Sequence, residues 1–106
     1  MAFLHYRGAA FQIERARQAG YANMMEDMLL SFTASSDDPI SGGRHKVLGS
    51  KELFIPPQTS TIASHLPKAV GAAVSVGLAK RMKPEHKQLP DDAIMLCSFG
   101  DASLNH

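Results

Sequence analysis

The sequence contains no tryptophan and only one cysteine, Cys97, and its charges nearly cancel to a formal net charge of +1. One cysteine cannot form a disulfide within the chain, and it favours a reducing compartment. The small net charge argues against a nucleic-acid or acidic-membrane surface. There is no basic-then-apolar signal segment at the start, and the longest weakly polar run, 69–79, is far shorter than the roughly 20 apolar residues of a membrane-spanning helix. We therefore expect a cytoplasmic protein with neither nucleic acid nor a membrane as partner.

Three segments have the pattern of helices, in a chain whose 106 residues are enough for at most one small domain. Helical spacing of apolar residues runs over 8–18, with Gly20 as a stop, and over 23–34, a methionine-rich segment. A third helix is predicted over 67–83, where Pro67 suits the first turn. The glycines inside this helix each cost up to ~1 kcal/mol relative to alanine, so they need a packing reason.

The one strand that the sequence predicts clearly runs over 93–99 and is followed by Gly100 and Asp101. A buried strand that ends in Gly-Asp brings a carboxylate to the carboxyl edge of an α/β sheet, where ligands bind. A carboxylate is a hard ligand suited to Mg²⁺, which completes its shell with phosphate oxygens and water. Asp101 fits a cap of the following helix as well, and the two roles are compatible. Because a parallel sheet needs several strands covered on both faces, we expect an incomplete α/β fold that is mainly helical.

Four blocks of the sequence carry a resemblance to a known family. They are Tyr6-Arg7, Gly43-Arg44-His45, Thr59 to Gly71, and Phe99 to Ala102. In this order and spacing they resemble the α subunit, or α-like half, of the E1 components of thiamine-diphosphate-dependent 2-oxo acid dehydrogenases. The resemblance implies that residues 1–106 are a partial thiamine-diphosphate-binding domain of parallel-sheet type, truncated at its C-terminal end.

The resemblance also implies roles in binding the organic cofactor. Tyr6 and Arg7 match the pair that grips the diphosphate, a task that suits the bidentate fork of arginine. Ser60 and Ile62 fall where the family contacts the aminopyrimidine ring, Ile62 through its backbone carbonyl. These four residues would hold the two ends of thiamine diphosphate.

Metal ligands are implied in the same way. Asp101 matches the first Mg²⁺ ligand of the split cofactor motif, and Ala102 stands where the family usually has glycine. The family's second Mg²⁺ ligand, an asparagine, has no match in this chain. A structural monovalent cation, which some members bind, would take oxygens of Thr59, Thr61 and Ser64.

His65 is the candidate catalytic residue. It departs from the α subunits of the family, but the Ser-His-Leu run over 64–66 is similar to one in the 2-oxoglutarate branch. A histidine at the start of a helix that faces a cofactor would donate a hydrogen bond to a carboxylate or carbonyl of the substrate. A structural histidine that caps the helix fits the sequence equally well. His45 would also face the site if its loop folded over it, although a surface position suits a loop histidine better.

Taken together, the resemblance implies oxidative decarboxylation of a 2-oxo acid, with transfer of the acyl group to a lipoyl arm. The expected partners are a β-type E1 subunit or half and a lipoyl-bearing acyltransferase, in an oligomer. The glutamate that activates the cofactor has no match here, so we expect the parent protein to be the enzyme and the isolated chain to be inactive. Two alternatives stay open: a transketolase-like thiamine enzyme with another acceptor, and a truncated fragment without activity.

The sequence makes one further prediction, about exposed apolar surface. The helices of the chain lack the neighbouring strands that an α/β fold requires. We expect apolar surface around Met24, Met28, Leu96 and Phe99, and therefore aggregation or dependence on a partner.

Overall fold

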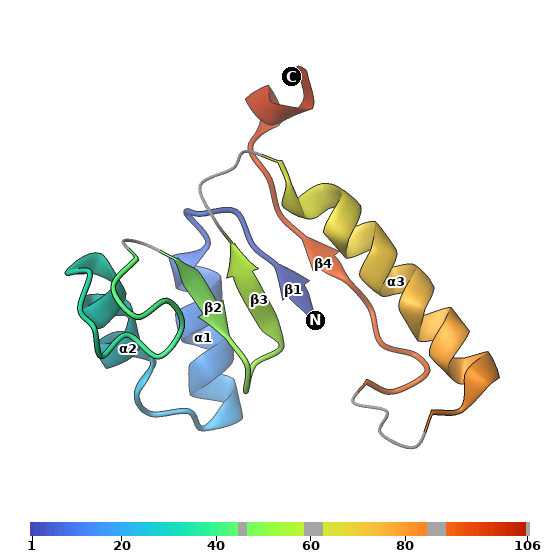
Figure 1. Ribbon diagram of the computed structural model, residues 1–106, viewed down its shortest axis with the longest axis horizontal. Helices are drawn as coiled ribbons and strands as arrows, with labels where there is room; N and C mark the ends of the chain where they lie inside the picture. The colour runs from blue at the N-terminus through green and yellow to red at the C-terminus, as the bar shows by residue number, and fades with distance from the viewer. Residues whose placement is uncertain (45–46, 59–62, 85–88, 106) are drawn as a thin grey trace.

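The computed structural model describes residues 1–44, 47–58, 63–84 and 89–105, and it is a small mixture of helices and short strands (Figure 1). The α-helices are α1 (Ala9–Ala19), α2 (Met24–Phe32) and α3 (His65–Met82), and a 3₁₀-helix, η1, spans Asp101–Asn105. The strands are β1 (Ala2–Phe3), β2 (Leu48–Ser50), β3 (Ile55–Gln58) and β4 (Leu96–Cys97). Within the described ranges, no helix is long and apolar enough to cross a membrane.

The strands form two pairs that lie next to each other. β1 pairs with β4 in parallel, with Ala2 opposite Leu96, and β2 pairs with β3 in an antiparallel hairpin. The amide of Ala2 donates to the carbonyl of Phe54 at 3.0 Å, which joins β1 to the hairpin. The strands therefore follow one another in the order β2, β3, β1, β4 (Figure 1).

The expectation of a single strand was wrong. β1 is only two residues long, too short for an alternating pattern to be visible in the sequence. β3 contains Pro56 and Pro57, and proline normally argues against a strand because it cannot donate to the ladder. The strand predicted over 93–99 exists, but its paired part is limited to β4.

The three predicted helices are confirmed, with ends close to those expected. α1 ends at Gly20, which adopts the left-handed conformation with φ 71°. α3 begins two residues before Pro67, so the proline lies in the first turn, where its missing amide breaks no helical hydrogen bond.

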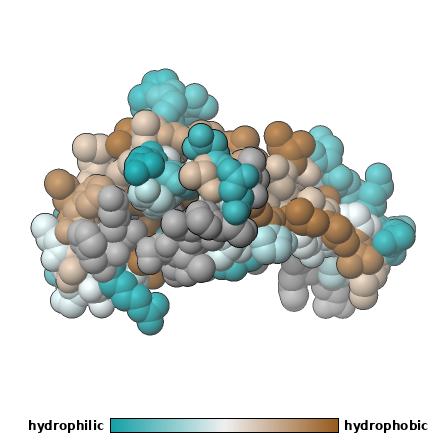
Figure 2. All heavy atoms as spheres, turned by 90° about the horizontal axis from the view of Figure 1, so that it is seen from above, coloured by the Kyte–Doolittle hydropathy of each residue, from teal (hydrophilic) through white to brown (hydrophobic). Residues whose placement is uncertain are grey.

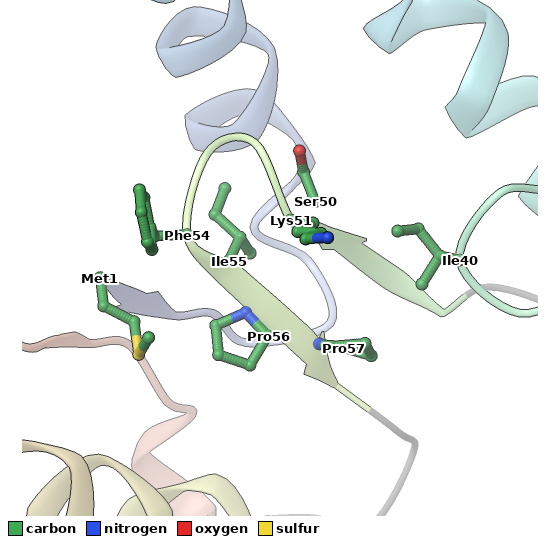
Figure 3. A pocket seen from close by; sticks show the side chains of 8 residues that line it. All are labelled: Met1, Ile40, Ser50, Lys51, Phe54, Ile55, Pro56 and Pro57. Atoms are coloured by element: carbon green, nitrogen blue, oxygen red, sulfur yellow. The ribbon is translucent and has the colours of Figure 1, made fainter. Parts of the chain in front are cut away.

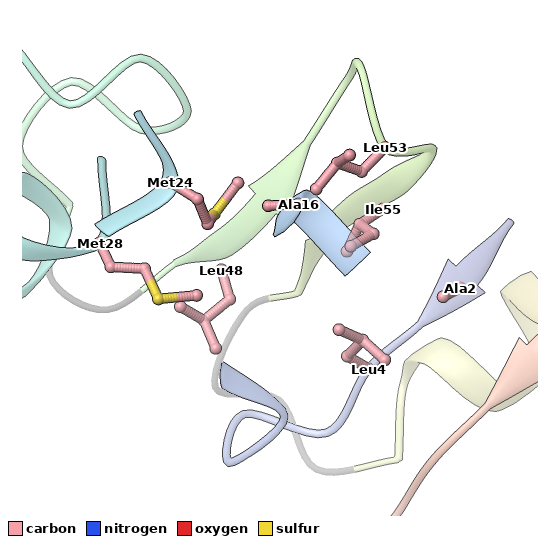
Figure 4. Close-up of a cluster of buried hydrophobic side chains, with 8 residues drawn as sticks. All are labelled: Ala2, Leu4, Ala16, Met24, Met28, Leu48, Leu53 and Ile55. Atoms are coloured by element: carbon pink, nitrogen blue, oxygen red, sulfur yellow. The ribbon is translucent and has the colours of Figure 1, made fainter. Parts of the chain in front are cut away.

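The core lies between α1, α2 and the hairpin (Figure 4). Its buried members are Ala2, Leu4, Ala16, Met24, Met28, Leu48, Leu53 and Ile55. The buried side chain of Gln12 ties α1 to β2, because its Nε2 donates to the Gly49 carbonyl at 2.8 Å. The expected exposure of Met24 and Met28 was therefore wrong, since α2 turns both of them toward α1 and β2.

The expected exposure of the C-terminal segment is confirmed. Leu96 and Phe99 are 42% and 41% exposed. α3 also leaves one face open: Val70, Val74, Leu78 and Met82 are all exposed, at intervals of four residues. Figure 2 shows apolar surface on the side of the molecule where α3 lies. The buried residues of α3, His65 and Ala69, lie on the face that packs against β1 and β4.

Candidate functional site

The parallel pairing of β1 with β4 brings the two ends of the chain together. Because the strands are parallel, the residues after each of them emerge at the same edge. The amide of Ser98 donates to the Phe3 carbonyl at 3.0 Å, and the amide of His5 donates to the Ser98 hydroxyl at 2.9 Å. We refer to segments 5–7 and 98–101, together with His65, as the carboxyl edge.

His65 reaches this edge from the first turn of α3. Its side chain is almost fully buried, and Nε2 lies 2.7 Å from the carbonyl oxygen of Ser98. A carbonyl can only accept, so Nε2 carries the proton and donates it to Ser98. In the neutral ring Nδ1 is then an acceptor, and among the described residues this buried atom has no partner. Nε2 of His65 therefore uses its proton within the fold, whereas Nδ1 is an acceptor that has no partner among the described residues.

His5 is a member of the edge that sequence reasoning missed. Its Nδ1 accepts a hydrogen bond from the amide of Arg7 at 3.2 Å, and its ring centroid lies 4.1 Å from that of Tyr6. Its Nε2 lies 3.5 Å from the point that a Cβ on Gly100 would occupy. Partial burial, followed by electrostatic interaction with Arg7 and with His65, lowers the pKa of His5. No local pattern in the sequence marks this residue, because its position depends on the pairing of the two chain ends.

Tyr6 and Arg7 lie in the turn that follows β1. The amide of Gly8 donates to the His5 carbonyl at 2.7 Å and closes this turn. A Cβ on Gly8 would lie 2.9 Å from that same carbonyl oxygen, so the turn requires glycine. The guanidinium carbon of Arg7 lies 4.7 Å from the centroid of the Tyr6 ring, a cation–π distance. The exposed arginine is therefore held over the aromatic ring at the carboxyl edge.

Asp101 lies after β4 and is the first residue of η1. Its side chain is exposed, as is that of Ala102. The amide of Ser103 donates to the Gly100 carbonyl at 3.1 Å, so the turn that carries Asp101 is fixed from within. In the described ranges no group of three or more His, Cys, Asp and Glu side chains could hold a metal ion. Asp101 is thus suited to be one ligand of a Mg²⁺ ion that also binds phosphate oxygens, and it is not a complete metal site.

Several predicted site residues lie outside the described residues. These are His45, Thr59, Ser60, Thr61 and Ile62. Ser64 is described, and it occupies the N-cap position of α3, next to His65. The structure therefore brings together Tyr6, Arg7, His65 and Asp101 from the predicted set.

A hollow of about 280 Å³ lies elsewhere, on the hairpin. It is lined by Met1, Ile40, Ser50, Lys51, Phe54, Ile55, Pro56 and Pro57 (Figure 3). None of these residues belongs to the carboxyl edge, and most of them are apolar. This hollow and the carboxyl edge are therefore separate features of the surface.

The carboxyl edge combines two kinds of chemistry. His5 and Arg7 offer hydrogen-bond donors to an anion, and Asp101 offers a carboxylate to a cation. No family model, curated protein or solved structure matches the chain. The chemistry of this edge is therefore indicated by its own residues, most of which belong to the sequence blocks that carry the resemblance.

Proposed function

We propose that the chain is part of the E1 component of a thiamine-diphosphate-dependent 2-oxo acid dehydrogenase, to which it contributes contacts with the diphosphate and Mg²⁺. The parallel pairing of β1 with β4 is the observation that supports this best. It places two separate sequence blocks, Tyr6-Arg7 and Gly100-Asp101, at one carboxyl edge. In α/β folds with parallel strands, ligands bind at this edge.

Each residue has a task that suits its chemistry. Arg7 donates charge-assisted hydrogen bonds to diphosphate oxygens, for which its planar fork is well shaped. Asp101 is a carboxylate ligand of Mg²⁺, whose remaining positions are filled by phosphate oxygens, by water and by groups outside this chain. His65 is almost fully buried, and its Nε2 donates to the carbonyl of Ser98, so it holds the start of α3 against segment 98–101.

The residues of this chain bind and orient the cofactor, and the cofactor carries out the reaction. When bound, thiamine diphosphate supplies the electron sink that decarboxylation of a 2-oxo acid requires. The proposal requires a β-type E1 subunit or half and a lipoyl-bearing acyltransferase as acceptor. In this assembly the present chain binds the charged diphosphate end of the cofactor.

Calorimetric titration with thiamine diphosphate, with and without Mg²⁺, tests the proposal. We expect Mg²⁺-dependent binding by the full chain and its loss in Asp101→Ala, because that variant lacks the carboxylate ligand. Asp92→Ala is the matched control, since Asp92 is an exposed carboxylate that precedes β4, whereas Asp101 follows it. Circular dichroism should show the same fold in both variants. Failure of the chain to bind thiamine diphosphate, or equal binding by Asp101→Ala, would contradict the proposal.

A further inference from the structure

We propose that His5 is a further binding residue of the carboxyl edge, whose Nε2–H donates a hydrogen bond to a phosphate oxygen of an anionic ligand. This inference rests on the proposed function, and it adds a residue that lies outside the sequence blocks that suggested that function. It also names the ligand chemistry, a phosphate or diphosphate group.

The tautomer of His5 follows from its neighbour. Nδ1 accepts the hydrogen bond from the Arg7 amide, so this nitrogen has a free lone pair and carries no proton. In the neutral ring the proton is therefore on Nε2. The turn after β1 thus requires that Nε2 be a donor, which is the group that a phosphate oxygen accepts from.

The Nε2 donor is available. The backbone of His5 is fixed from both sides, because its amide donates to Ser98 Oγ and its carbonyl accepts from Gly8. Among the described residues, no side chain or carbonyl accepts a hydrogen bond from Nε2. The ring is only half-buried, so this free donor can be reached from solvent.

The surroundings of the donor favour an anion. Burial lowers the pKa of His5 most, and among the described residues electrostatic interaction with Arg7 and with His65 lowers it further. Tyr6 contributes its ring, and Gly100 contributes no side chain. A lowered pKa keeps His5 neutral near pH 7, which preserves both its bond to the Arg7 amide and its donor. A ligand that accepts from His5 also comes under the positive charge of Arg7.

Gly100 keeps the space beside the donor open. A Cβ at this position would lie 3.5 Å from Nε2, which is an ordinary van der Waals contact. An alanine would therefore be tolerated by the fold, yet its methyl group would stand next to the donor. Gly100→Ala is thus a second variant that tests access to Nε2 while His5 itself is unchanged.

Inorganic pyrophosphate is the probe, with affinities measured by calorimetry on the full chain. In His5→Asn the shorter amide keeps an acceptor near the position of Nδ1 and removes the Nε2 donor, so we expect affinity to fall about tenfold or more. His5→Gln places an amide N–H near the position of Nε2 and should stay within about threefold of the parent. Gly100→Ala should weaken binding as His5→Asn does. In the parent chain, pyrophosphate should shift the ¹⁵N resonance of His5 Nε2.

The outcomes separate this inference from the proposed function. Unchanged pyrophosphate affinity in His5→Asn, an unmoved Nε2 resonance, or no binding of pyrophosphate by the parent chain would each overturn the role of His5. If thiamine diphosphate still binds in an Asp101-dependent way in that case, the proposed function stands without His5. If pyrophosphate binds through His5 and thiamine diphosphate binds no better than pyrophosphate, the anion site stands and the proposed cofactor is wrong.

Discussion

Arg7 lies exposed at the end of β1, with its guanidinium over the ring of Tyr6. If this fork grips a diphosphate, Arg7→Lys should weaken the binding of thiamine diphosphate about tenfold or more, although the charge is kept. Lysine offers a point charge on a flexible stem and loses one of two charge-assisted hydrogen bonds. Calorimetry on the Mg²⁺-loaded chain measures the effect.

Arg81→Lys serves as the control, because Arg81 is exposed in the last turn of α3. It should bind thiamine diphosphate as the parent does. If Arg7→Lys also binds like the parent, and Arg7→Ala loses only a few-fold, Arg7 is a surface charge. The functional proposal would then depend on Asp101 and on the block around α3.

The hydrogen bond of Tyr21 predicts that the stability of the protein depends on pH. Its hydroxyl donates to Asp27 Oδ2 at 2.7 Å, and this bond, together with burial, raises the pKa of Tyr21 from 10.0 to about 12. The folded protein therefore holds the phenolic proton more tightly than the unfolded chain does. The contribution to stability is fully present below about pH 10 and is lost as pH rises toward 12.

Urea unfolding of the parent and of Tyr21→Phe across this range measures the contribution. The free energy of unfolding of the parent should exceed that of Tyr21→Phe at pH 8, and the difference should shrink as pH rises above 10. Other groups titrate equally in both proteins, so their effects cancel in the comparison. A difference that stays constant with pH would show that the bond to Asp27 does not control this proton.

Some residues of the candidate site could be predicted from the sequence and others could not, for a physical reason. Asp101 could be predicted, because a Gly-Asp pair after an apolar run places a carboxylate at a strand end whatever lies beside it. His5 could not, because its role depends on contacts with Ser98 and Gly100, which are far away in the sequence. Nor could the tautomer of His65 be predicted, since it is set by the carbonyl of Ser98.

Among the elements, the helices were predictable and most strands were not. Helix ends carry local signals, such as Gly20 after α1 and Pro67 in the first turn of α3. β1 and β4 are two residues each, and they form a pair only because the ends of the chain meet. No periodicity in the sequence can report such a pair.

The left-handed residues that follow α1 and α2 differ in type, and this difference predicts how substitutions at the two positions change the free energy of unfolding. Both are followed by a residue in the left-handed conformation, Gly20 with φ 71° and Ala34 with φ 53°. The amides of Tyr21 and Ser35 donate back to the helix carbonyls of Ala16 and Leu30, as in a Schellman motif. Glycine adopts this conformation freely, whereas an L-residue with a Cβ pays about 1–2 kcal/mol.

We therefore expect Ala34→Gly to raise the free energy of unfolding by up to about 1 kcal/mol, and Gly20→Ala to lower it by about the same amount. Ala73→Gly is the control, because Ala73 lies inside α3 with ordinary helical geometry, where glycine should cost about 0.5–1 kcal/mol. Urea unfolding followed by circular dichroism measures all three. If Ala34→Gly destabilises as Ala73→Gly does, the left-handed conformation of Ala34 carries no strain.

At the scale of the whole molecule, the core and the carboxyl edge occupy different parts of the structure. The core is formed by α1, α2 and the hairpin, with only Ala2 and Leu4 coming from the β1 segment. α3 adds just His65 and Ala69 to the buried residues. The half of the molecule that carries the candidate site is thus held together by few buried apolar side chains, and its outer face is apolar.

The open face of α3 leads to a prediction about association. Val70, Val74, Leu78 and Met82 are 42–78% exposed along one line of the helix, and contiguous apolar surface of this kind favours contact with a partner. Gly71 and Gly77 lie on the same helix, and a Cβ on either would meet nothing within 4 Å. Within the described part of the chain, the packing reason for these costly glycines is therefore missing, and a partner that approaches the helix closely would supply it.

We expect the isolated chain to associate with itself as its concentration rises, and the double variant Val74→Ser, Leu78→Ser to remain monomeric to clearly higher concentration. Serine removes the apolar side chains of this face, and both positions are exposed, so the core is untouched. Met25→Ser, Leu29→Ser is the matched control, because it removes two exposed apolar side chains of α2 and leaves α3 intact. Analytical ultracentrifugation over a concentration series measures the effect. A parent chain that stays monomeric throughout and unfolds in one cooperative transition would show that α3 needs no partner, and equal relief by both double variants would show that its face is not the preferred contact.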